Sequence, residues 1–202
     1  MYAGIRHASS HTWQQVAGER WESMARERGG NEMTEEQSNG VVDGNPRMVA
    51  ALLDLIAWER RALEQAVTGM SDDALVATSG DWSAKDHLAH VAAWERRLVG
   101  EVQGDHDAAR FGLDEATFSA TNTDNFNALL HARHRDDPPA TMRAEFHASG
   151  EALHTAFAEL SDADLLQPVR PDDPDVETLI DLIAWDTFKH YPEHVTAITG
   201  QA

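Results

Sequence analysis

The chain of 202 residues contains no cysteine. This absence excludes disulfide bonds, thiolate metal sites and a cysteine nucleophile, so any thiol chemistry needs a thiol that a cofactor or substrate brings in. Long apolar runs are also lacking. Nothing approaches the roughly 18 apolar residues of a membrane span, and the first thirty residues contain no apolar core of a signal peptide. We therefore expect a cytoplasmic protein.

Basic residues are scarce, with 16 Lys and Arg against 35 Asp and Glu and a net charge of −19. A phosphate backbone or an anionic membrane surface would be repelled, so we expect neither nucleic acid nor membrane as a partner. Hydrophobic residues make up 42% of the chain, which is enough for a packed interior. We see no sign of a second core, and this favours one domain with an extension.

The extension is at the start of the chain. Residues 1–44 are polar and rich in Gly, Glu, Arg and Ser. We interpret them as a flexible N-terminal arm. The compact domain is then residues 45–202.

Apolar residues recur at helical spacing in four stretches. They predict helices at 46–68, 83–102, 139–160 and 176–199, and no stretch has a convincing strand pattern. Ser83 is expected to cap the second helix, with Asp86 three residues later as an acidic variant of the capping box.

An internal repeat supports this layout. The connectors 71–75 (SDDAL) and 161–165 (SDADL) follow the first and third helices, and 93–95 (AWE) in the second helix matches 184–186 (AWD) in the fourth. Two similar helical hairpins joined by a long crossover, residues 103–137, describe an all-α four-helix bundle.

Histidines mark the fourth helix. His190 and His194 lie one turn apart along its apolar stripe, so both rings can bind one metal ion. The alternative is a pair of satisfied or half-exposed histidines. His131 and His134, three apart in the crossover, are a second possible pair, but the surrounding ARHRDD favours solvated side chains.

A third ligand is expected from the second helix, because helices two and four can face each other across the core of such a bundle. That helix offers His87 and His90. Helical-wheel geometry places His87 nearer the centre of the apolar face and His90 at its edge. The residues alone do not decide between them.

Two carboxylates occupy matching positions near the apolar faces, Glu95 on helix two and Asp186 on helix four. A carboxylate there is costly unless it is paired or near a cation. Either could orient a ligand histidine or act as a general base, and both are our candidate catalytic residues. The alternative is a salt bridge to Arg60, Arg96 or Arg97.

The segment WSAKDHLAHVAAWE resembles the helix-two signature of the DinB/YfiT family of metalloenzyme-like proteins. The resemblance as a whole covers residues 45–200. In that family a ligand histidine follows eight residues after the Trp of a Trp-Ser start, and from Trp82 this spacing selects His90. The other two family ligands form His-x3-His on the last helix, and HYPEH matches at His190 and His194. Pro192 between them departs from a regular helix interior, because it removes a hydrogen bond and kinks the axis. The chain is most similar to the ClbS/DfsB-like branch, followed by maleylpyruvate-isomerase-type domains.

The resemblance implies a four-helix bundle with a three-histidine site for a divalent ion, with Zn or Ni as the expected metal. Three neutral imidazoles leave a coordination position open, which is the catalytic pattern of a metal site. We expect a metal-dependent hydrolase, isomerase or thiol-dependent transferase that acts on a small molecule, with a low-molecular-weight thiol as the candidate cosubstrate. The alternatives are a self-protection protein that sequesters a small molecule and a non-catalytic dimerising bundle. We also expect a homodimer.

Overall fold

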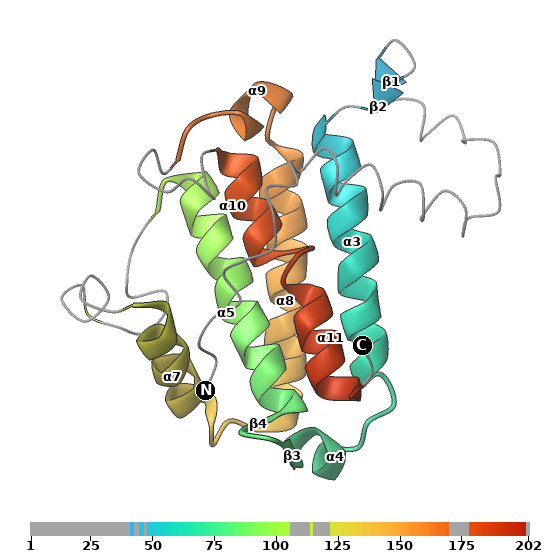
Figure 1. The fold of residues 1–202 in the computed structure, drawn as a ribbon, viewed down its shortest axis with the longest axis vertical. Helices are drawn as coiled ribbons and strands as arrows, with labels where there is room; N and C mark the ends of the chain where they lie inside the picture. Colours follow the sequence, from blue (N-terminus) through green and yellow to red (C-terminus); the bar gives the residue numbers. More distant parts are fainter. Residues whose placement is uncertain are drawn as a thin grey trace, which may run out of the picture.

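Helices dominate the chain in the computed structural model, which describes residues 41–42, 45–46, 48–105, 114, 122–169 and 178–200. Its long helical segments run side by side: α3 (Met48–Val67), α5 (Ala84–Gln103), α8 (Pro139–Ala158) and the pair α10 (Leu179–Asp186) and α11 (Tyr191–Thr199) (Figure 1). The predicted all-α fold is confirmed. Among the described residues, no helix is both long and apolar enough to cross a membrane. The predicted arm, residues 1–44, lies outside the described residues except for Val41–Val42.

Three shorter helices join these segments: α4 (Asp72–Val76), α7 (Thr123–His134) and α9 (Asp162–Leu165). The repeated connectors form α4 and α9. Ser71 and Ser161 cap the two helices with their side chains, and Leu75 and Leu165 are fully buried. The repeat in the sequence thus corresponds to a repeated local structure. Each connector inserts one leucine into the core, and its serine accepts a hydrogen bond from the third amide of the helix, that of Ala74 or Asp164.

Two antiparallel pairs of two-residue strands correct the expectation that the chain has no strand. β1 (Val41–Val42) pairs with β2 (Asn45–Pro46), and β3 (Thr78–Ser79) pairs with β4 (Trp82–Ser83). The first helix therefore begins at Met48 and not at residue 46. Gly80 has φ of 75° in the turn between β3 and β4, and glycine adopts this conformation without the penalty of a Cβ. This tight turn creates a short ladder between β3 and β4 that apolar periodicity does not reveal.

The start of α5 follows the prediction closely. The Ser83 side chain accepts a hydrogen bond from the backbone N–H of Asp86 at 3.2 Å, and the Asp86 carboxylate accepts one from the backbone N–H of Ser83 at 2.9 Å. This capping box satisfies two amides that have no partner within the helix. Burial alone would raise the pKa of Asp86, but the two hydrogen bonds from Ser83, with Lys85 and His131 nearby, outweigh it and lower that pKa.

The fourth helix is broken, which corrects the predicted continuous helix over 176–199. α10 ends at Asp186, Thr187 leaves the helical region with φ of −129° and ψ of −104°, and α11 begins at Tyr191. The backbone N–H groups of His190 and Tyr191 both donate to the carbonyl of Thr187, each at 2.8 Å. Pro192 falls in the first turn of α11, where an N–H has no partner within the helix. The proline that is unusual inside a helix is thus well placed at the start of one.

Candidate metal centre

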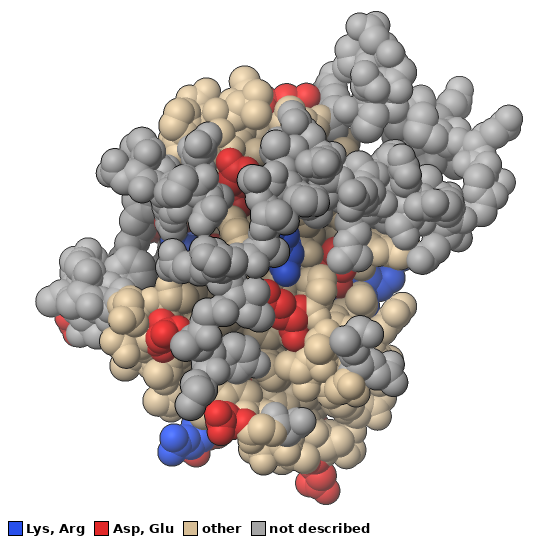
Figure 2. Space-filling model, in the orientation of Figure 1, with Lys and Arg blue, Asp and Glu red and all other residues tan. Residues whose placement is uncertain are grey.

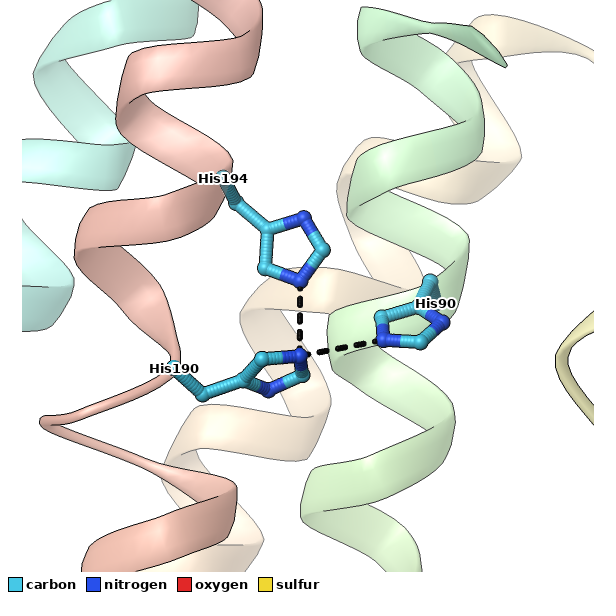
Figure 3. A group of neighbouring side chains, drawn as sticks. All are labelled: His90, His190 and His194. Atoms are coloured by element: carbon cyan, nitrogen blue, oxygen red, sulfur yellow. Dashed lines mark hydrogen bonds between the residues drawn. The ribbon is translucent and has the colours of Figure 1, made fainter. Parts of the chain in front are cut away.

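Three histidines from two segments of the bundle converge on one point (Figure 3). His90 lies in the second turn of α5, His190 directly precedes α11, and His194 lies one turn into α11. His190 Nε2 is 3.2 Å from His90 Nε2 and 2.9 Å from His194 Nε2. One ring nitrogen from each residue lies within 4.8 Å of the others. We call these three residues the histidine cluster.

The break in the fourth helix determines where His190 and His194 lie relative to each other. His190 is the N-cap residue of α11, with helical φ and ψ, so it still stands one turn before His194 although α10 ends four residues earlier. His90 and His194 are buried, and His190 is half-buried. Pro192 lies in the first turn of the helix that carries His194 and therefore does not interrupt that helix.

The surroundings keep the cluster neutral. Burial lowers the pKa of His190 to about 4. Burial also lowers the pKa values of His90 and His194 well below the ordinary value, and the neighbouring imidazoles add to the effect because like charges would meet. All three rings are therefore uncharged at neutral pH. A neutral imidazole is the form that binds a metal ion.

The donor set fits a metal ion better than it fits hydrogen bonds alone. Each ring nitrogen of a neutral imidazole offers either one N–H or one lone pair in the ring plane. His190 Nε2 faces two other ring nitrogens, and a single proton or lone pair does not serve both well. A tetrahedral ion with metal–nitrogen distances of about 2.0–2.1 Å separates its ligand nitrogens by about 3.3–3.4 Å. The observed contacts of 3.2 and 2.9 Å are close to this spacing.

His87, the other candidate on α5, contacts His194 from a different side. Its Nδ1 lies 2.9 Å from Nδ1 of His194, whereas the nitrogen that His194 directs at the cluster is Nε2. Burial lowers the pKa of His87 to about 4, although Asp86 opposes the shift. The structure therefore brings His90 into the histidine cluster and places His87 behind one member of it. The assignment of His90, His190 and His194 as metal ligands stays a prediction.

Glu95, a candidate catalytic residue, lies in a buried hydrogen-bond network. Its Oε1 accepts hydrogen bonds from Arg60 Nε at 2.9 Å and from the Tyr191 hydroxyl at 2.7 Å. Its Oε2 accepts one from the Ser149 hydroxyl at 2.5 Å and lies 3.5 Å from the second Arg60 nitrogen. We call this set the Glu95 network. It joins α3, α5, α8 and α11, and it includes the Arg60 salt bridge that the sequence offered as the alternative to catalysis.

Asp186, the second catalytic candidate, also forms an ion pair. Its Oδ2 accepts a hydrogen bond from Arg97 at 2.9 Å, and both side chains are mostly buried. Arg97 is a partner that the sequence analysis proposed as an alternative. The catalytic roles of Asp186 and Glu95 stay predictions, and the observed contacts tie α10 and α11 to α5.

Sequence reasoning missed the aromatic side of the centre. The Trp82 ring lies 5.2 Å from the His90 ring and 5.4 Å from the His87 ring, centroid to centroid. The His131 ring stacks on Trp82 at 5.4 Å with an interplanar angle of 4°, and its Nε2 lies 3.5 Å from Asp86. His131 is thus half-buried and not paired with His134, which instead contacts Asp137 at 2.8 Å. The Trp-Ser spacing could have indicated that Trp82 lies beside His90.

Most of the chain matches one known protein family. Residues 55–193 match the DinB superfamily, and the chain belongs to it. The predicted family is therefore confirmed. No curated protein matches the sequence.

Solved structures share the fold. An uncharacterised protein from Escherichia coli UTI89 superposes with a TM-score of 0.59 at 14% identity, over 78% of this chain and 94% of that one. A protein from Streptococcus pneumoniae has a TM-score of 0.63 at 10% identity, over 81% and 94%. The colibactin self-resistance protein ClbS, in complex with double-stranded DNA, has a TM-score of 0.56 at 11% identity, over 77% and 95%. The likeness to ClbS is consistent with the predicted branch, and at these identities it establishes the fold.

The ClbS complex corrects one expectation. From the net charge of −19 we expected no nucleic-acid partner. This expectation was wrong, because a protein of this fold is seen with double-stranded DNA. Net charge sums over the whole chain, whereas attraction to phosphates depends on the local field at the surface. On the face in Figure 2, basic side chains are interspersed with acidic ones among the described residues. The expected homodimer and cytoplasmic location stay predictions.

Proposed function

We propose that this chain is a metal-dependent enzyme that acts on a small molecule, with His90, His190 and His194 as the ligands of one divalent ion. The observation that carries the proposal is the approach of three Nε2 atoms, with His190 Nε2 at 3.2 and 2.9 Å from the other two. Imidazole ligands suit Zn²⁺ and Ni²⁺. Three protein ligands leave room for a water or substrate atom, which is the catalytic pattern.

The residues of the chain would hold, orient and shield the ion. The histidine cluster would hold it from two segments, and the position of His190 at the N-terminus of α11 maintains the one-turn spacing to His194. Burial keeps the rings neutral, and the Trp82 ring packs against His90. When bound, the ion would lower the pKa of a coordinated water toward ~7, polarise a carbonyl or stabilise an incoming thiolate.

Metal content tests this proposal directly. We expect purified protein, stripped with a chelator and then dialysed against Zn²⁺ or Ni²⁺, to retain about one ion per chain by elemental analysis, as the three-ligand site predicts. His190→Ala should lose it. His147→Ala is the matched control, because His147 is 73% exposed on α8. Equal metal content in His190→Ala and the wild type would contradict the proposal.

Turnover separates an enzyme from a sequestering protein. The metal-loaded protein would be incubated with activated esters and with reactive electrophiles, each with and without a low-molecular-weight thiol. Repeated turnover supports the enzyme. A single equivalent of substrate bound or consumed per chain would instead favour sequestration, the alternative function that the sequence left open.

Asp186 remains our proposed carboxylate for proton transfer near the centre. It directly precedes the break between α10 and α11, and its partner Arg97 holds its carboxylate in place. Asp186→Asn should lower kcat while metal content stays at the wild-type level. A loss of metal in that variant would show that Asp186 acts through the fold of the site and not through proton transfer.

A further inference from the structure

The two ring nitrogens of His194 meet different neighbours. Nε2 faces His190 Nε2 at 2.9 Å, on the side of the histidine cluster. Nδ1 faces Nδ1 of His87 at 2.9 Å, with the two rings at an interplanar angle of 64°. His87 lies on α5 three residues before His90, so one helix supplies both a member of the cluster and a contact to the back of another member.

A contact between two neutral imidazole nitrogens needs one N–H and one lone pair. If His194 donates from Nδ1, its Nε2 carries a lone pair directed at the cluster. If His87 donates, His194 carries its proton on Nε2, and that proton points at the position the ion would take. The 2.9 Å contact therefore determines whether His194 is ready to bind a metal ion.

The other ligand on the neighbouring helix lacks such a contact. Within the described part of the chain, the buried Nδ1 of His90 has no hydrogen-bond partner. An acceptor behind a metal-binding histidine holds the ring and selects its tautomer, and its loss typically weakens metal affinity about 10–100-fold. His87 is in position to be this acceptor for His194.

We propose that His87 is a positioning residue, whose Nδ1 accepts a hydrogen bond from Nδ1–H of His194 and so directs the Nε2 lone pair of His194 at the metal position. The role rests on the proposed function, because it concerns the same three ligands. It assigns to His87 a task distinct from ligation. The same contact orients His194 before any ion is bound.

The first test is the tautomer of His194 in the metal-free protein. Long-range ¹H–¹⁵N NMR at pH 7.5 distinguishes a proton on Nδ1 from one on Nε2. We expect His194 to carry its proton on Nδ1 in the wild type, and in His87→Leu to populate both tautomers. If His194 in the wild-type protein carries its proton on Nε2, this measurement alone overturns the proposal.

The second test is Zn²⁺ affinity, measured by competition with a chromophoric chelator. His87→Leu, which cannot accept a hydrogen bond, should bind Zn²⁺ about 10–100-fold more weakly. His87→Asn, whose side-chain oxygen can replace Nδ1 as the acceptor, should stay close to the wild type. Equal affinity in His87→Leu and wild type, or equal weakening in both variants, would overturn the role of His87. If no form of the protein binds Zn²⁺ while NMR shows the expected tautomers, the proposed function fails and the positioning of His194 stands.

Discussion

Replacing Glu95 with glutamine should be among the most destabilising single changes in the domain. The Glu95 side chain is fully buried, and its partner Arg60 is 10% exposed. Removing the charge leaves the guanidinium buried without its main counter-ion, which typically costs about 3–5 kcal/mol. The Arg60 contact to Glu64, whose side chain is 46% exposed, offsets part of the loss and favours the lower end, about 3 kcal/mol.

A surface pair provides the matched control. Arg96 and Glu145 join α5 to α8 at 2.9 Å, the same distance at which Arg60 and Glu95 join α3 to α5. The side chains of Arg96 and Glu145 are 30% and 39% exposed. Exposed pairs contribute about 0–1 kcal/mol, so Glu145→Gln should change stability little. The two substitutions delete the same charge and differ in burial and in the additional hydrogen bonds that Tyr191 and Ser149 donate to Glu95.

Thermal unfolding of the metal-free protein, followed by circular dichroism, measures both variants. At about 2–4 °C per kcal/mol for a chain of this size, Glu95→Gln should lower the midpoint by about 6–12 °C and Glu145→Gln by less than about 4 °C. The double variant Arg60→Met with Glu95→Leu should recover part of the loss, because it removes the buried charge as well as its partner. Equal midpoints for Glu95→Gln and Glu145→Gln would refute the structural importance of the Glu95 network.

Two further predictions concern Gly150, which lies beside the Glu95 network, and the pH dependence of stability. Gly150→Ala should destabilise the protein by up to about 2 kcal/mol in urea titrations. A Cβ there would overlap the Arg60 guanidinium at a cost of about 1–3 kcal/mol, and the higher helix propensity of alanine offsets about 1 kcal/mol of it. An unchanged midpoint would show that Arg60 has another route to Glu95. Burial lowers the pKa values of His87 and His190 to about 4, so the unfolded chain, with an ordinary histidine pKa of about 6.5, binds protons first as the pH falls. The free energy of unfolding of the metal-free protein should therefore drop, by up to about 1.4 kcal/mol per pH unit for each histidine, between about pH 6.5 and 4. Equal stability at pH 7 and pH 5 would contradict this.

Sequence patterns predict those features of the fold that depend on residues close together in the chain. Apolar periodicity gives α3, α5 and α8 to within two residues but does not reveal the break in the fourth helix. The Ser83 capping box depends only on residues three apart. Spacing likewise places His190 and His194 on one face. The choice between His87 and His90 depends instead on the height at which α11 meets α5, which is a tertiary property. The wheel put both histidines near that face, and both indeed contact His194 or His190, but through different nitrogens.

The carboxylates show a second limit of sequence reasoning. Matching positions on two helices identified Glu95 and Asp186 as unusual, because an ionised group near an apolar face needs a partner. The pattern did not identify the partners, since Arg60 and Arg97 reach them from other turns and other helices. The Tyr191 hydroxyl also donates to Glu95, and it does so from the first residue of α11.

The break between α10 and α11 predicts both the sign and the size of the stability change in Pro192→Ala. If the fourth helix were continuous, Pro192 would sit in its interior, and removing it would relieve a clash and stabilise the protein by up to about 3 kcal/mol. In the observed structure Pro192 lies in the first turn of α11, where its ring fits and no N–H is needed. Pro192→Ala then mainly increases the freedom of the unfolded chain, so it should destabilise the protein by about 0.4–1 kcal/mol in urea titrations. A stabilised Pro192→Ala variant would mean that α10 and α11 form one strained helix, and that the one-turn placement of His190 and His194 arises from a kink and not from a new helix start.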